Sequence, residues 1–204
     1  MQLYLLFLAM ATATVISPGP GVVMTLSNAL RFGRRGTVGG ILGVAFGALV
    51  VAGLSATSLG VLLATSALAF TVLKFIGAAY LIYLGIRLWR APPLDLNQRP
   101  AQVADSFRKR FMEGVSLQLT NPKVVLFFLS IFPQFIDGHS SYATQFTTLV
   151  LTYCALVVAV HLVYALCAKR AKHWLTSERG GRAMNRASGA TFMCFGAALA
   201  SASR

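Results

Sequence analysis

The sequence is short of charge, and acidic residues are the scarcest of all. Only 5 of its 204 residues are Asp or Glu, and charged residues of both signs make up 11% of the chain, whereas soluble domains contain about 25%. Three cysteines are too few for a disulfide scaffold. A hydrophobic content of 56% also excludes a disordered chain, which cannot bury enough apolar surface to fold. These observations leave a membrane protein as the class that fits.

The sequence also lacks the patterns of enzymatic and cofactor chemistry. It has no GxxxxGK[ST] phosphate loop, and its three His and three Cys do not have metal-ligand spacing. Five acidic residues supply no inward-facing carboxylate pair for general acid–base catalysis. A membrane-embedded enzyme would need a catalytic cluster at one membrane face. We therefore expect a protein that is not an enzyme, with no catalytic residue, no metal and no cofactor.

Long runs without charge indicate membrane-spanning helices, because about 20 apolar residues cross a hydrocarbon layer of about 30 Å. The first run extends from Met1 to Leu30 and lacks a basic region before it, so we expect an uncleaved first span rather than a signal peptide. The sequence predicts an all-α, polytopic membrane protein with a single transmembrane domain over residues 1–204. Its six expected spans cover residues 2–30, 38–63, 67–88, 111–132, 145–168 and 187–203.

Basic residues are concentrated in the loops between these spans, on one side only. Fifteen of the 18 Lys and Arg lie at 31–35, 87–110 and 169–186, and the alternate loops around 64–66 and 133–144 have none. By the positive-inside rule the basic loops are cytoplasmic, so both termini are expected in the periplasm. Charges divided among short loops do not form one nucleic-acid-binding surface. The net charge of +13 is therefore an orientation signal, and the expected surroundings are membrane lipids.

The two halves of the chain contain a similar pattern. The spacing K-x-x-G-x-x-Y-x-x-Y begins at Lys74, and R-x-x-G-x-x-F-x-x-F begins at Arg186. Three spans per half place the halves in the membrane in opposite senses. We therefore expect two inverted three-helix repeats, about 1–90 and about 111–204, joined by a cytoplasmic loop of about 91–110. One repeat rocking against the other would give alternating access.

Proline interrupts the first span of each half. It removes a backbone donor and clashes with the preceding turn, so the helix is expected to break there. Backbone groups freed at membrane depth must face protein or a water-filled cavity, and a half-helix restarting after the break presents N–H groups that suit a carboxylate. A simple proline kink is the alternative. Two breaks in matching places favour a substrate site between the repeats. Its candidate residues are Ser17, Pro18, Gly19, Pro20, Gly21, Asn121, Pro122 and Lys123.

Three titratable residues near the spans are candidates for specific roles. Lys123 lies within an apolar segment, where a charge is costly and usually faces a cavity or a partner. It would hold a substrate carboxylate, pair with Glu113, or extend to the interface. Glu113 and His161 are the candidates for proton coupling, since imidazole titrates near neutral pH. For His161, a hydrogen-bonded structural role is the simpler interpretation.

Together these motifs resemble the LysE/RhtB family of amino-acid exporters, over essentially the whole chain. The resemblance implies a secondary transporter that exports amino acids or close derivatives across the bacterial inner membrane, coupled to the proton gradient. It leaves open which amino acid is the substrate and whether the active unit is a homodimer. An exporter of a metal ion or another small solute on the same scaffold is the alternative, and would want acidic or thiolate ligands. The residues that carry the resemblance lie at 17–21, 33–36, 74–81, 121–123, 132–135 and 185–189.

Overall fold

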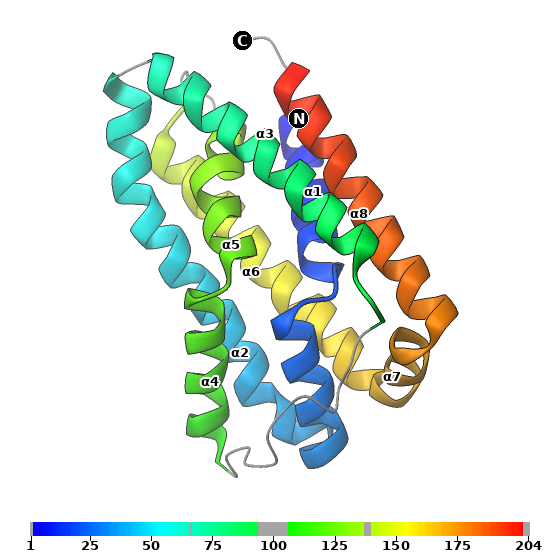
Figure 1. Ribbon diagram of the computed structural model, residues 1–204. Coiled ribbons are helices and arrows are strands. Elements are labelled where there is room, and N and C mark those ends of the chain that lie inside the picture. The colour runs from blue at the N-terminus through cyan, green and yellow to red at the C-terminus, as the bar shows by residue number, and fades with distance from the viewer. Residues whose placement is uncertain (1, 66, 94–105, 137–139, 202–204) are drawn as a thin grey trace.

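The protein is a bundle of helices, as a computed structural model shows (Figure 1). Residues 2–65, 67–93, 106–136 and 140–201 are described, and within them every regular element is helical, which confirms the all-α prediction. The elements are α1 (Gln2–Ile16), α2 (Pro20–Thr65), α3 (Ala67–Arg90), α4 (Phe107–Leu119), α5 (Pro122–Leu126), η1 (Phe127–Ile131), η2 (Phe132–Phe135), α6 (Tyr142–Leu166), α7 (Ala168–Thr176) and α8 (Glu178–Ser201).

The composition of these helices suits a lipid environment. Two helices in the described part of the chain are by themselves long and apolar enough to cross a membrane: Pro20–Ala56, with a mean hydropathy of 2.1, and Tyr142–Leu166, with 2.3. A shorter apolar stretch, Leu3–Ile16, forms most of α1. Large apolar side chains also face outward on several helices, including Leu54, which is 66% exposed. An outer surface this apolar indicates contact with lipid.

The long helices alternate in direction along the chain (Figure 1). In that view α1 and the start of α2 run downward, and the rest of α2 runs upward. The third helix, α3, runs downward, the segment from α4 to η2 runs upward, α6 runs downward and α8 runs upward. Both ends of the chain therefore lie near the top of the bundle.

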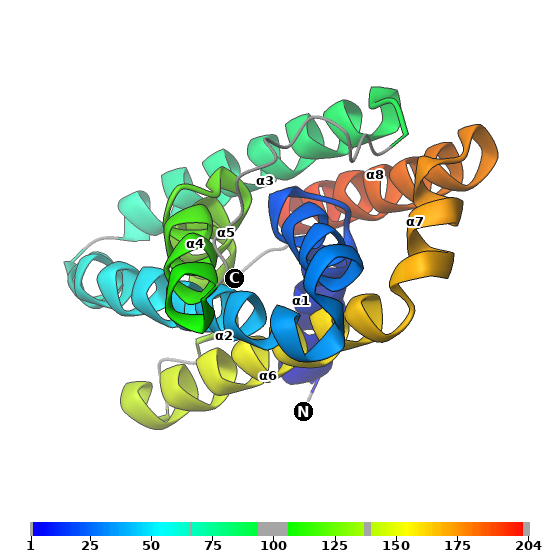
Figure 2. The ribbon, with the colours of Figure 1, turned by 90° about the horizontal axis from the view of Figure 1, so that it is seen from below.

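The closest helix pairs join the first half of the chain to the second. Helix α2 packs against α4 and α6, and α3 lies along α8, as the view from below shows (Figure 2). Glycines bring the backbones together, since a Cβ atom at Gly189 would lie 2.6 Å from the carbonyl oxygen of Gly85. A Cβ atom at Gly114 would likewise collide with the carbonyl oxygen of Gly40. Small residues at such contacts are typical of helix packing in membranes.

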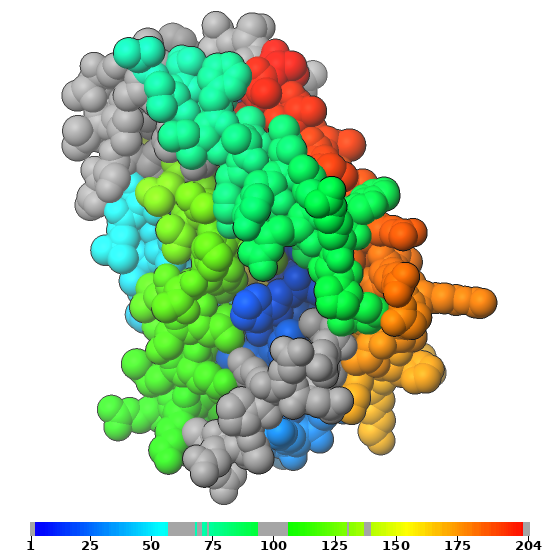
Figure 3. Space-filling view, in the orientation of Figure 1, coloured from blue at the N-terminus to red at the C-terminus, as the bar shows by residue number. Residues whose placement is uncertain are grey.

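The core lies where α1 meets η1 and α6. Phe7, Phe128 and Tyr153 are fully buried there, and the ring centroids of Phe128 and Tyr153 lie 5.0 Å apart. Only a small area of the blue N-terminal segment is visible between α3 and α4 on the face shown in Figure 3. Helix α1 is buried on one face only: Phe7, Ala11 and Val15 face the core, whereas Leu5 is exposed. Ser17, in the break at the end of α1, is fully buried.

The chain turns between the first two expected spans within the predicted segment, but the turn is only one residue long. Residues 31–35 were expected between a span at 2–30 and a span at 38–63, but α2 continues through them and leaves helical geometry only at Gly33. The φ angle of Gly33 is 67°, a left-handed conformation that glycine adopts without a steric penalty. A single residue thus makes the turn, because glycine removes the need for a longer connection.

The fourth and sixth expected spans, and the loop at 91–110, also begin or end elsewhere. Helix α4 begins at Phe107 instead of 111, and α8 begins at Glu178 instead of 187. Helix α7 lies where a loop was expected. Lys and Arg are good helix formers, so helices continue past the hydrophobic boundary into the basic segments. The third and fifth spans agree with α3 and α6 within three residues, while residues 94–105 and Ser66 of the expected 64–66 turn lie outside the described residues.

Candidate functional site

Both predicted proline breaks are present. Helix α1 ends at Ile16 and α2 begins at Pro20, while α4 ends at Leu119 and α5 begins at Pro122. Each new helix therefore begins with proline, whose missing N–H costs nothing in the first turn and whose fixed φ suits a helix start. The residues between the helix ends leave the helical path, and the two breaks meet inside the bundle through the side chain of Lys123.

The prolines of the first break leave two carbonyl groups of α1 without their helical donors. The carbonyl of Thr14 would accept from residue 18 and that of Ile16 from residue 20, but both positions are proline and carry no N–H. Each carbonyl is instead satisfied by a side chain from the second half. Lys123 Nζ donates to Thr14 O at 2.7 Å, and Tyr164 Oη donates to Ile16 O at 2.8 Å.

Lys123 makes a second contact at the same place. Its Nζ also donates to the carbonyl oxygen of Ser17 at 3.2 Å. The C-terminal end of a helix carries a partial negative charge, so an ammonium group is well placed there. The charge that the sequence placed within an apolar segment is thus held by backbone oxygens of α1, and Lys123 joins the two halves of the chain.

Asn121 is the N-cap of α5. Its Oδ1 accepts from the backbone N–H of Lys123 at 3.2 Å, and its Nδ2 donates to Gln118 Oε1 at 3.5 Å. Asparagine is among the preferred N-cap residues, because its side-chain oxygen satisfies an otherwise free N–H. The cap fixes the start of α5 and so determines where the side chain of Lys123 begins.

His161 faces the first break from α6. Its Nδ1 lies 2.7 Å from Thr25 Oγ1, and the ring is buried, with 4% of its surface exposed. A Cβ atom at Gly21 would lie 3.1 Å from His161 Cε1, so the glycine makes room for the imidazole. The hydrogen bond expected of a structural histidine is present, and the ring also borders the space between the breaks.

A cavity of about 20 Å³ lies between the two breaks, with room for about one water molecule. Valines from four helices form its apolar wall. The hydroxyl of Ser17 is buried and has no hydrogen-bond partner among the described residues. Such a hydroxyl is available to hydrogen-bond a molecule that enters the cavity. The polar lining consists of Thr14, Ser17, Gln118, Asn121, Lys123, Tyr153 and His161.

The cavity gathers most of the predicted residues but not all of them. Gly19 and Gly21 also line it, whereas Pro18, Pro20, Pro122 and Glu113 are not among its described lining residues. The prolines act through the backbone, and Glu113 lies on α4 more than two turns before Asn121.

Gln118 and Tyr153 also line the cavity but were not predicted. Gln118 lies one helical turn before Asn121, and Tyr153 lies two turns before His161, so helical spacing from the predicted residues was the available signal.

Two apolar clusters border the cavity. One contains Phe7, Phe128 and Tyr153, and Tyr153 also lines the cavity. In the other, Val22 and Leu26 pack against Leu175 of α7 and Ala168, and Val22 also lines the cavity.

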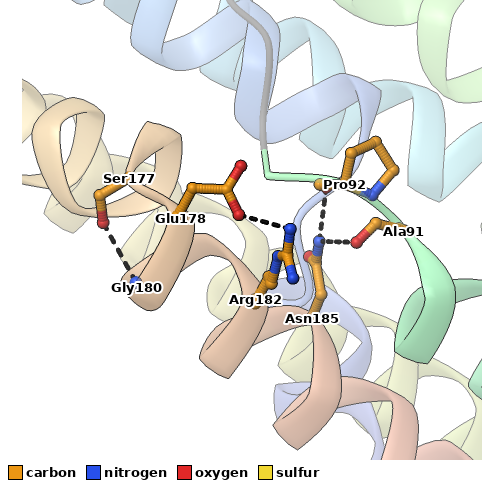
Figure 4. Close-up of polar contacts among 7 residues, drawn as sticks. All are labelled: Ala91, Pro92, Ser177, Glu178, Gly180, Arg182 and Asn185. Carbon is orange, nitrogen blue, oxygen red and sulfur yellow. Dashed lines mark hydrogen bonds and ion pairs between the residues drawn. The ribbon is translucent and has the colours of Figure 1, made fainter.

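A second helix end is also capped by the opposite half (Figure 4). Asn185 of α8 donates through Nδ2 to Ala91 O at 3.2 Å and to Pro92 O at 2.8 Å, just after α3 ends. Near the start of α8, Glu178 and Arg182 form an ion pair of 2.6 Å on the surface. The cap at α3 uses a neutral amide, in contrast with the ammonium group at α1.

Comparison with known proteins relates nearly the whole chain to one family. A family model described as LysE type translocator matches residues 12–203. A homoserine/homoserine lactone efflux protein of Salmonella typhimurium is 38% identical over 197 residues, which cover 96% of this chain and 95% of the relative. An uncharacterized membrane protein of Vibrio cholerae is 35% identical over 98% of both chains. A leucine efflux protein of Salmonella choleraesuis is 28% identical over 97% of this chain and 94% of the relative. No solved structure matches the chain.

Proposed function

Because the chain belongs to the LysE-type translocator family, we propose that it exports an amino acid or a close derivative across the bacterial inner membrane. The observation that carries the proposal is the meeting of two broken helices at a small polar cavity. Discontinuous helices whose ends face a substrate are the usual binding arrangement of secondary transporters. The names of two relatives, which refer to efflux of homoserine or its lactone and of leucine, support the same substrate class.

The proposed architecture has six spans in one domain, 1–204, built as two inverted repeats. The first repeat would comprise α1 with the start of α2, the rest of α2, and α3. The second would comprise α4 to η2, α6, and α8. The alternating helix directions in Figure 1 support this division. The basic segments at 31–35 and 169–172 follow downward helices, which supports cytoplasmic loops at the bottom and periplasmic termini at the top.

The substrate is proposed to bind between the breaks. Backbone N–H groups at Gly21 and Val22 begin α2 and suit a carboxylate, and α1 ends in carbonyls that suit an ammonium group. The present cavity has room for little more than one water, so binding requires the site to open. Export driven by the proton gradient is part of the proposal, with His161 inside the site and Glu113 on α4 as the candidate proton carriers.

An exporter of metal ions fits the site less well. Metal transport requires carboxylate or thiolate ligands along the path for hard or soft cations respectively. The described lining of the cavity contains neither group. No cluster of metal-binding side chains occurs elsewhere among the described residues. The lysine at the cavity would also repel a cation.

The proposed function is tested by efflux from cells that lack their own amino-acid exporters. Cells expressing the protein are preloaded with labelled homoserine, leucine and other amino acids, and release is measured with and without a protonophore. We expect faster release of at least one amino acid, which the protonophore slows. The same cells are challenged with toxic metal ions. Protection against metals, without release of any amino acid, would contradict the proposal.

A further inference from the structure

The contact between Lys123 and the end of α1 assigns a more specific task to the site. We propose that the carbonyls of Thr14 and Ser17 form an ammonium-binding site, which Lys123 occupies in the empty protein and the ammonium group of the substrate occupies during transport. This inference rests on the proposed export of amino acids. In this proposal Lys123 does more than bind the carboxylate of the substrate. In the empty protein its ammonium group occupies the site that the substrate's amino group later fills.

The site is built from backbone atoms and depends on Pro18. That proline has no N–H, so the carbonyl of Thr14 lacks its helical donor and points its lone pair at the break. Lys123 Nζ meets this oxygen at 2.7 Å and the oxygen of Ser17 at 3.2 Å. A lysine ammonium and the α-ammonium of an amino acid both offer three N–H donors. Two oxygens this close to one nitrogen therefore suit either group.

The substrate supplies what is needed to release the lysine. The cavity beside these carbonyls has room for about one water, but a neutral water replaces a charge-assisted hydrogen bond poorly. Lys123 therefore leaves most readily when another ammonium group takes over. A zwitterionic amino acid does so, and its carboxylate then faces the displaced ammonium group of Lys123. The resulting order is α1 carbonyls, substrate ammonium, substrate carboxylate, Lys123. Every charge has an opposite neighbour, and the net charge of the site is unchanged.

This order requires both charged groups of the substrate. An amine without a carboxylate would place two cations side by side, because the lysine is displaced with nothing to balance it. A carboxylic acid without an amine would leave no donor for the carbonyls of α1 once Lys123 turned toward it. The arrangement therefore selects zwitterions. When one binds, the direct contact of Lys123 with the carbonyls at the end of α1 is replaced by a contact that runs through the substrate.

The decisive test is chemical rescue of an emptied site. Lys123→Ala removes the ammonium group and leaves space beside the carbonyls of α1. The thermal stability of the purified full-length variant is measured with ethylammonium chloride and, at equal ionic strength, with tetramethylammonium chloride, which has no N–H donor. We expect ethylammonium to raise the melting temperature of Lys123→Ala with a saturable dose dependence. Tetramethylammonium should not, and neither salt should do so in the wild type or in the matched control Lys74→Ala.

Competition in the wild-type protein gives a second test that needs no variant. Homoserine is compared with its decarboxylated analogue, aminopropanol, and its deaminated analogue, hydroxybutyrate, as inhibitors of export in proteoliposomes. We expect homoserine to compete at least about tenfold better than either analogue, a factor that corresponds to about 1.4 kcal/mol.

The outcomes separate this inference from the proposed function. Equal responses of Lys123→Ala to the two ammonium salts would overturn the ammonium site, as would wild-type competition by hydroxybutyrate equal to that of homoserine. Export of amino acids would then still support the proposed function. If Lys123→Ala does not fold, the wild-type competition series decides alone. If no amino acid is exported, the proposed function fails, and the inference that rests on it is overturned as well.

Discussion

Two helices in this protein end at carbonyls that the opposite half of the chain caps, and the two caps differ in chemistry. At α3, the neutral amide of Asn185 donates to the carbonyls of residues 91 and 92. At α1, the ammonium of Lys123 donates to the carbonyls of residues 14 and 17 beside a small polar cavity. The amide belongs to a tightly packed helix pair, whereas the ammonium faces space that a ligand can enter. The cap at α3 therefore stabilises the fold, whereas the cap at α1 can be replaced by a ligand.

The largest effect is expected when the missing backbone donor at the end of α1 is restored, because the ammonium cap is then no longer needed. Pro18→Ala returns an N–H that can satisfy the carbonyl of Thr14 within the helix, so Lys123 loses its acceptor and the break is partly repaired. We expect export to be abolished while the protein remains in the membrane. Efflux of labelled amino acid and membrane abundance are measured together. Unchanged export would show that the break does not form the site.

A matched pair of glycines sharpens the description of the cavity. In Gly21→Ala the new methyl group would lie 3.1 Å from His161 Cε1, and in Gly19→Ala it would lie 3.5 Å from Lys123 Nζ. The first distance requires the imidazole to move, and the second is an ordinary contact. We expect this shift of the imidazole to reduce the export rate in Gly21→Ala by about tenfold, which corresponds to about 1.4 kcal/mol. Gly19→Ala should retain most of the rate. Equal losses in both variants would contradict this geometry.

The cap at α3 is expected to affect stability rather than transport. Asn185→Ala leaves two carbonyls without their donor, which costs about 1 kcal/mol of folding free energy, because Pro92 is exposed and its carbonyl can accept from water. We expect a lower melting temperature, with export per folded molecule close to that of the wild type. Thermal denaturation and efflux normalised to membrane abundance provide the comparison. A loss of export at normal stability would give Asn185 a direct part in transport.

The smallest effect is expected at the second cap of α1. Tyr164→Phe removes the hydroxyl that donates to Ile16 O at 2.8 Å and leaves the ring in place. The loss of one hydrogen bond costs about 1 kcal/mol, and Lys123 still holds the end of the helix. We expect a modest fall in melting temperature and at most a twofold change in export. Complete loss of export in Tyr164→Phe would mean that the two caps of α1 act as one unit.

The breaks and the lysine were accessible from sequence because proline and intramembrane charge act locally. Pro18 and Pro20 cannot donate hydrogen bonds in any packing, so the helix must end near them. The role of Asn121 as an N-cap was also recognisable, since asparagine before a proline is a helix-start signal. The sequence instead suggested that Asn121 would contact the substrate, a role for which its capped oxygen is less free.

The partners of Lys123 depend on tertiary packing and were not predictable. The lysine is more than 100 residues from the carbonyls that it contacts, and nothing in the local pattern of residues 121–126 indicates α1. The starts of α4 and α8 were missed for a different reason. Hydropathy shows which residues can lie in the hydrocarbon layer, but it does not show where a helix begins. Basic residues extend both helices beyond the apolar region.

The close contact of Gly85 with Gly189 bears on which part of the protein can move. The α3–α8 and α2–α4 pairs each combine one helix from either half, with backbones near enough that a methyl group would not fit. Rocking one half against the other would therefore have to slide or separate backbones that pack closely at these two pairs. The link between the halves that a substrate can exchange directly is instead the side-chain contact of Lys123 with the carbonyls of Thr14 and Ser17.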